Sequence, residues 1–328
     1  MEFISKCAAD SISNAARALI EGHLVAFPTE TVYGIGADAT NEKAVSRVYS
    51  VKGRPIGHPL IVHISSINKL DQWATDIPDY AIKLAREFWP GPMTLILPRT
   101  GIAKDFITGG QDNIGLRVPN QPIALALLRK FEELGGKGVA APSANRFGAV
   151  SPTMAHHVIE ELGEYLSEKD VILDGGPCSL GLESTIIDCT TSEPSILRVG
   201  LLTRGSIKNS IGFNIEDKNK MSNIKSSGSL KSHYSPQTEL VVNGIPTEGD
   251  GLIAMSTFQT PNGVLRISSP STMEEFSKNL YTDFRRADKQ GIKRIVVIEP
   301  TGEGYAEAVR DRIFKAAGSK KLFEIGEI

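Results

Sequence analysis

Two cationic side chains, two positions apart, are the part of the sequence best suited to chemistry. Lys52 and Arg54 lie in the run Lys52-Gly53-Arg54-Pro55, and Pro55 favours an extended backbone at Arg54. In an extended segment residues i and i+2 point to the same side, so both cations would face one ligand. Arginine binds phosphate as a planar fork and lysine as a point charge. The spacing indicates a polyphosphate site; two solvated surface cations would give the same pattern.

Polar loops elsewhere in the chain are suited to completing such a site. The run from Pro28 to Gly36 follows a predicted buried strand and is dense in threonine and glycine. Loops at strand ends commonly meet the substrate of an α/β sheet, although these residues could simply cap and permit turns. Pro142-Ser143-Ala144-Asn145 also follows a predicted strand, and the glycine-rich loop 174–185 could present N–H groups to an anion.

Two polar side chains interrupt apolar runs that are typical of strands. His63 lies in the run 59–64, where a core or edge histidine is the commoner alternative to a functional one. Arg117 lies in the run 114–119. Because a buried cation needs a counter-ion, Arg117 predicts either a protein carboxylate or an anionic ligand beside it.

Composition limits the class of protein. The chain has 328 residues, of which 41% are hydrophobic and 23% charged, and a formal net charge of −2. It is long enough for two domains, and its charge argues against tight unspecific nucleic-acid binding. Three cysteines without C-x-x-C spacing indicate neither a disulfide framework nor a zinc site. No run has the length of a membrane span, and no signal pattern opens the chain. We expect a soluble, cytoplasmic protein.

Hydrophobic periodicity predicts an α/β protein with two domains. Over residues 1–211, helices are expected at 11–22, 41–51, 78–88 and 121–134, and strands at 24–27, 59–64, 93–97, 114–119, 138–141, 171–173, 186–189 and 195–199. Residues 212–236 are rich in Asn, Lys and Ser, which indicates an interdomain linker. Over 237–328, strands alternate with helices in the pattern of a small α/β domain with a mainly parallel sheet.

Several motifs occur together in one order and at compatible spacing. They are Pro28-Thr29-Glu30-Thr31-Val32-Tyr33-Gly34, Lys52-Gly53-Arg54-Pro55, Pro142-Ser143-Ala144-Asn145, Glu183-Ser184-Thr185 and Leu197-Arg198-Val199-Gly200. The set resembles the YrdC-like threonylcarbamoyl-AMP synthases. His233-Tyr234-Ser235-Pro236 and the segment from Arg310 to Ala317 resemble the C-terminal domain of the longer members, so the resemblance covers nearly the whole chain.

The resemblance implies a fold and an activity. The fold would be a YrdC-like twisted mixed sheet with a concave active site, linked to a small Rossmann-like α/β domain. The enzyme would be an L-threonylcarbamoyladenylate synthase that uses L-threonine, bicarbonate and ATP, with Mg²⁺ accompanying ATP and no organic cofactor, and releases pyrophosphate. Its product would pass to a tRNA threonylcarbamoyl transferase for N6-threonylcarbamoyladenosine formation at tRNA position 37, with at most weak tRNA contact by this chain.

The same resemblance implies roles for individual residues. The catalytic set, which would cradle the triphosphate, is Lys52, Arg54, Ser143 and Asn145. The ATP-binding set is Lys52, Arg54, His58, Asn113, Ser143, Ser151, Arg198 and Tyr234. The L-threonine-binding set is Thr31, His63, Arg117, Ala141 and Ser184. Tyr234 would fold back with the linker over the site as a lid. No residue is expected to ligate a metal or to act as a covalent nucleophile.

Two departures from the family pattern bear on these roles. His58 stands where many relatives have Asn, but imidazole can also donate a hydrogen bond. Ser227-Gly228-Ser229 replaces a commoner Pro-Gly-Met pattern, which predicts a more flexible lid.

Two rival functions fit parts of the sequence. Carbamoyl-adenylate chemistry without threonine is one, but the chain has neither the room nor the cysteines for the extra zinc-finger and acylphosphatase-like regions that such proteins carry. A binding module for structured RNA is the other. Threonine-dependent ATP turnover separates an RNA-binding module from a synthase.

Overall fold

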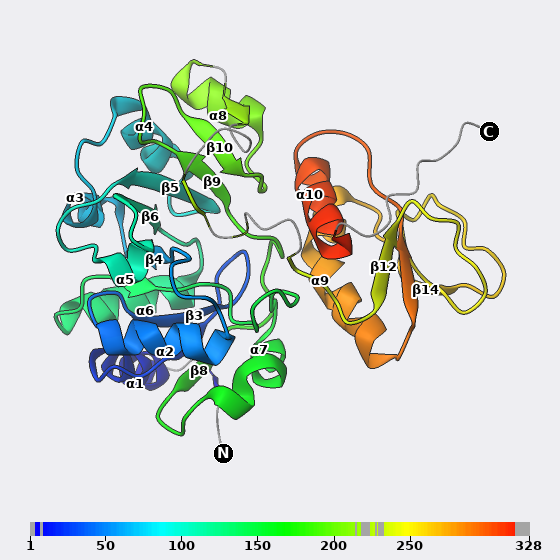
Figure 1. Cartoon of the computed structure of the whole chain (residues 1–328), viewed down its shortest axis with the longest axis horizontal. Helices are drawn as coiled ribbons and strands as arrows, with labels where there is room; N and C mark the ends of the chain where they lie inside the picture. Colours follow the sequence, from blue (N-terminus) through cyan, green and yellow to red (C-terminus); the bar gives the residue numbers. More distant parts are fainter. Residues whose placement is uncertain are drawn as a thin grey trace. The chain divides into compact units, whose positions relative to one another are not determined.

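The computed structural model describes residues 4–6, 9–213, 215–217, 224–226, 228 and 233–318, and they fall in two compact units. The second unit contains residues from Leu230 onward and two short segments from earlier in the chain, Gly148–Ser151 and Leu180–Leu182. In Figure 1 most of the second unit runs from yellow to red. The domain boundaries at 211 and 236 stay predictions, and Ser227 and Ser229 lie outside the described residues.

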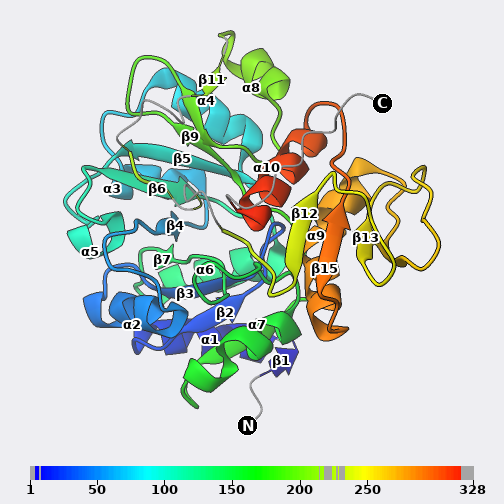
Figure 2. The same cartoon turned by 45° about the vertical axis from the view of Figure 1, so that its right-hand side comes forward.

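The first unit is built on one large mixed sheet. Its strands, in spatial order, are β1 (Ile4–Lys6), β8 (Val171–Asp174), β2 (Val25–Phe27), β3 (Gly34–Asp38), β7 (Val139–Ala140), β4 (Ile61–His63), β6 (Asn113–Arg117), β5 (Met93–Pro98), β9 (Thr185–Asp188), β10 (Ser195–Arg198) and β11 (Glu216–Asp217). The sheet combines parallel pairs, such as β4 with β6, and antiparallel pairs, such as β5 with β6. The predicted α/β class with a mixed sheet is confirmed, and Figure 2 shows the sheet's twist.

Helices cover both faces of this sheet. On one face α1 (Ala9–Ile20) and α6 (Pro122–Glu133) pack through Leu19, Leu128 and Phe131 against Phe27 of β2. The opposite face is covered by α2 (Glu42–Lys52), α3 (Leu70–Trp73), α4 (Asp79–Phe88), α5 (Asp105–Thr108), α7 (Ala155–Leu162) and α8 (Arg204–Ile211). In the part of the chain that is described, no helix combines the length and apolarity needed to cross a bilayer.

The second unit carries a smaller sheet in which every strand pair is parallel. Its order is β12 (Glu239–Val242), β15 (Arg294–Val297), β13 (Gly251–Ile253) and β14 (Leu265–Ser268). Helices α9 (Met273–Lys289) and α10 (Tyr305–Ala317) pack on it. The predicted parallel sheet is therefore confirmed, although the chain passes from β13 to β14 without an intervening helix.

Strand β3 is the main element that the sequence did not predict. The turn-rich appearance of residues 28–36 hides a strand that pairs with β2 on one side and β7 on the other. Gly36 shows why glycine is needed there, because a Cβ would lie 2.6 Å from Val139 Cγ1 and 2.8 Å from Phe27 Cε1. Glycines permit close packing in this strand, and they also remove the alternating apolar pattern by which strands are recognised.

Candidate active site

Lys52 is the last residue of α2, so the predicted extended backbone over residues 52–54 is wrong. Gly53 ends the helix in the left-handed conformation, with φ 60°, a common way for a helix to end. The Lys52 side chain is buried, and its Nζ donates to Ser143 O at 2.6 Å and Asn145 O at 2.5 Å. The structure therefore brings the two separate motifs of the predicted phosphate site together.

The Lys52 ammonium lies in a buried, cation-rich setting. The side chain is 2% exposed, and burial, followed by the neighbouring charge of Arg54, lowers the pKa of Lys52 well below its ordinary value. Arg54 is itself buried and donates from Nη2 to Pro59 O at 3.0 Å. Two adjacent cations held out of water create a position that favours an anion.

Phe147 brings two members of the predicted ATP-binding set together. The Arg54 guanidinium lies 5.9 Å from the Phe147 ring centroid, and the His58 ring meets the same ring edge-on at 5.7 Å. Burial, followed by the charge of Arg54, lowers the pKa of His58. His58 is therefore a neutral hydrogen-bonding side chain near neutral pH, as an Asn would be.

Several predicted residues share one face of the sheet. His63 and Arg117 are register partners in β4 and β6, and Asn113 lies on the same face because side chains alternate along a strand. A pocket on this face is lined by Asn113, neighbouring apolar residues of β4, β5 and β9, and the segment Ile224–Ser226. Gln111 and Lys225 hold that segment by reciprocal hydrogen bonds of 2.7 and 3.0 Å.

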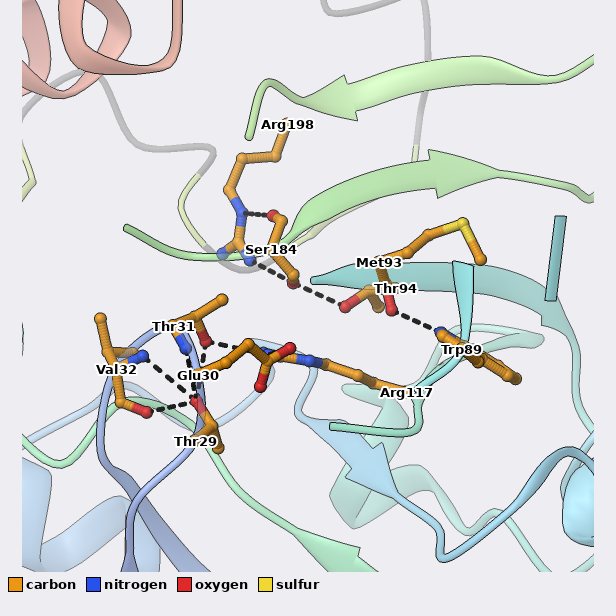
Figure 3. Close-up of polar contacts among 10 residues, drawn as sticks. All are labelled: Thr29, Glu30, Thr31, Val32, Trp89, Met93, Thr94, Arg117, Ser184 and Arg198. Atoms are coloured by element: carbon orange, nitrogen blue, oxygen red, sulfur yellow. Dashed lines mark hydrogen bonds and ion pairs between the residues drawn. The ribbon is translucent and has the colours of Figure 1, made fainter. Parts of the chain in front are cut away.

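Arg117 has a protein carboxylate as its counter-ion. Its Nη2 lies 2.7 Å from Glu30 Oε1 and donates to Thr31 Oγ1 at 2.9 Å, as Figure 3 shows. The sequence left a protein carboxylate and an anionic ligand open as partners, and the structure supplies Glu30. Within the described chain, the buried Nε of Arg117 has no hydrogen-bond acceptor, so the guanidinium keeps a donor for a ligand.

A second polar group is built around Ser184. Its Oγ lies 2.8 Å from Thr94 Oγ1, and Arg198 donates to Ser184 Oγ and to Ser184 O at 3.0 Å each. Figure 3 shows these side chains across from Thr31 and Arg117. The hydroxyls of Ser184 and Thr94 are fully buried, and this hydrogen-bond network holds them in fixed positions.

His63 is a buried neutral imidazole. Burial, followed by the charge of Arg117, lowers the pKa of His63 to about 3, and its ring meets Phe27 edge-on at 5.9 Å. It therefore does not exchange protons near neutral pH. Ala141 lies beside the same strand, where its N–H donates to Ile61 O at 3.0 Å.

Two members of the predicted ATP-binding set, Ser151 and Tyr234, belong to the second unit. Ser151 is fully buried. The Tyr234 ring stacks on Tyr281 at 5.7 Å between centroids, and the Arg312 guanidinium lies 5.2 Å from its centroid. The role of Tyr234 as a lid stays a prediction.

Sequence reasoning missed two residues of these polar groups, Glu30 and Thr94. The buried cation at Arg117 was the signal for Glu30, because such a cation requires a nearby carboxylate. Nothing in the local sequence marks Thr94. No group of three or more His, Cys, Asp or Glu side chains suited to a metal ion occurs among the described residues.

The chain matches two protein-family models and is similar to several known proteins over most of its length. A family model described as Telomere recombination (Sua5, YciO and YrdC) matches residues 17–200, and one described as Threonylcarbamoyl-AMP synthase, C-terminal domain, matches residues 202–318. A threonylcarbamoyl-AMP synthase of Pyrococcus abyssi is 39% identical over 323 residues, with 93% of each chain covered. One of Bacillus subtilis is 35% identical over 332 residues, covering 95% of this chain and 94% of the relative.

The crystal structure of P. abyssi Sua5 complexed with L-threonine is similar over nearly its whole length. The TM-score is 0.86 at 36% sequence identity, and 96% of both chains is covered.

Proposed function

This chain belongs to the two-domain threonylcarbamoyl-AMP synthase family, and on that premise we propose that it condenses L-threonine, bicarbonate and MgATP into threonylcarbamoyl-AMP and pyrophosphate. The observation that carries the proposal is that the polar group around Lys52 lies next to the polar group around Thr31 and Arg117. Ala144, between Ser143 and Asn145, donates to Tyr33 O at 2.8 Å, so the segment that holds Lys52 adjoins the loop that carries Thr31.

Lys52 and Arg54 are the residues we assign to the triphosphate. An ammonium has three N–H donors, and two are used by Ser143 O and Asn145 O, which leaves one for a phosphate oxygen. In this account Ser143 and Asn145 act through main-chain carbonyls that aim Lys52. Fixed cations stabilise charge that builds on the α-phosphate as the carbamate oxygen attacks it. Mg²⁺ enters with ATP, as part of that substrate.

The threonine subsite lies at Arg117 and Ser184. The carboxylate of threonine takes the Nε donor of Arg117, and Thr31, His63, Ala141 and Ser184 surround the rest of the molecule. His58, Asn113, Ser151, Arg198 and Tyr234 are assigned to the nucleotide. The product passes to a tRNA threonylcarbamoyl transferase that forms N6-threonylcarbamoyladenosine at tRNA position 37.

Pyrophosphate release from MgATP tests this proposal. The purified full chain is assayed with both co-substrates, without L-threonine and without bicarbonate. We expect release only when both are present. Release that is indifferent to threonine would contradict the synthase and favour another carbamoyl-adenylate chemistry.

A further inference from the structure

Glu30 is a buried carboxylate, and the substrate contacts proposed above do not include it. It lies in the loop between β2 and β3 and is 4% exposed. Oε1 is at ion-pair distance from Arg117, 2.7 Å, yet in the described chain no donor directs its hydrogen at either carboxylate oxygen. A buried carboxylate without hydrogen bonds is costly, so these oxygens indicate a ligand donor.

The charge pattern matches a zwitterion. Among the described residues, Arg117 keeps an Nε donor without a hydrogen-bond acceptor. Neither Glu30 oxygen accepts a hydrogen bond from the described part of the chain, although Oε1 lies at ion-pair distance from Arg117, and the two side chains lie next to each other in Figure 3. An α-amino acid presents the complementary pair, a carboxylate beside an ammonium. The carboxylate of such a ligand would accept from Arg117, and its ammonium would donate to Glu30. Hydrogen bonds of this charge-assisted kind are stronger than those between neutral groups.

We infer that Glu30 binds the α-ammonium group of threonine and accepts its proton; this inference rests on the proposed function. Transfer of one proton from R–NH₃⁺ to the Glu30 carboxylate leaves R–NH₂ with a free electron pair. That pair forms the N–C bond to bicarbonate carbon. The C–OH bond breaks, and the hydroxide leaves as water with a second proton from nitrogen. The carbamate remains, and protonated Glu30 returns its proton to solvent.

Two groups near Glu30 bear on its electrostatic environment. Arg117 from β6 lies at ion-pair distance from Glu30, and the charge of Glu30 acts on the Cys178 thiol. Burial, followed by the charge of Glu30, raises the pKa of Cys178 to about 12, so the thiol stays neutral.

Binding of two ligands separates this role from a structural one. L-threonine and 3-hydroxybutanoate share the carboxylate and the hydroxyl, but 3-hydroxybutanoate has no amino group. We expect Glu30→Gln to weaken L-threonine binding about tenfold, the effect of losing a charge-assisted bond worth about 1.4 kcal/mol. Binding of 3-hydroxybutanoate should not weaken. Glu87→Gln, an exposed carboxylate on α4, is the matched control.

Two results would overturn the inference. If the affinities for both ligands fell equally, Glu30 would only support Arg117. If neither affinity changed, Glu30 would contact neither ligand. If Glu30→Gln does not fold, Glu30→Asp makes the same comparison with the carboxylate withdrawn by one methylene. Failure of the wild-type chain to bind threonine or to form product would instead refute the proposed function.

The rate supplies a second readout. With threonine saturating, kcat of Glu30→Gln should fall and then approach the wild-type value as pH rises, because the free amine becomes available without an acceptor. A ratio of the two kcat values that stays constant with pH would contradict proton transfer to Glu30.

Discussion

Replacing Lys52 by methionine tests the geometry on which the phosphate site depends. Methionine keeps much of the length and volume of lysine but cannot donate a hydrogen bond. The change removes the donor from two carbonyls, Ser143 O and Asn145 O. An unsatisfied buried acceptor costs about 1–3 kcal/mol, which would give about 2–6 kcal/mol for the two.

Removing the buried charge of Lys52 offsets part of this loss of stability. The lowered pKa of Lys52 shows that burial disfavours its charged form, and apolar replacements of buried charges recover stability in other proteins. We therefore expect a net loss of about 2–3 kcal/mol, or a fall in melting temperature of roughly 5–10 °C for a unit of this size.

The assay compares Lys52→Met with Lys43→Met, an exposed lysine on the same helix. Calorimetry gives the melting temperature and titration calorimetry gives the affinity for MgATP. Lys43→Met should leave both unchanged, whereas Lys52→Met should lower both. Equal melting temperatures would refute the claim that the ammonium holds the 143–145 segment, and unchanged affinity would refute its contact with phosphate.

Three further predictions follow from other parts of the structure. Arg117→Ala should raise the KM for threonine at least about tenfold with little change in the KM for ATP; steady-state kinetics with each substrate varied checks this, and an unchanged threonine requirement contradicts it. Burial raises the pKa of Asp283 to about 6, above the unfolded value near 3.8, so this carboxyl stabilises the fold fully below about pH 4 and loses about 3 kcal/mol of that stability as pH rises to 6. Asp283→Asn should abolish that loss in melting curves taken from pH 4 to 7, and identical pH profiles for the two proteins would refute it. Gly36→Ala should cost about 1–3 kcal/mol through overpacking, whereas Gly101→Ala, where a Cβ meets open space, should be neutral in the same melting assay; equal effects would show that close packing at β3 is not the cause.

Apolar periodicity predicted the regular elements well because it reports burial directly. The helix at 121–134 matches α6, and the strand at 93–97 matches β5. Periodicity carries no information on which strands become neighbours. The position of β7 between β3 and β4 depends on contacts between segments about 100 residues apart in the chain.

Sequence reasoning proposed the cations and hydroxyls of the candidate site, but it did not predict their local geometry. Lys52 and Arg54 lie near each other, and they do so through a left-handed Gly53 at a helix end rather than through an extended segment. Pro55 favoured extension at Arg54, and that preference says nothing about Gly53. Glu30 could not be assigned from its own neighbourhood, because its ion-pair partner Arg117 lies on a strand far along the chain.

The identity of the product shows whether this chain makes threonylcarbamoyl-AMP. The full chain is incubated with L-threonine, MgATP and ¹³C-bicarbonate, and the nucleotides are resolved by mass spectrometry. We expect an adenylate with the mass of threonylcarbamoyl-AMP that carries one ¹³C atom and does not form when threonine is omitted. An adenylate without the label, or one that forms equally well without threonine, would contradict this expectation.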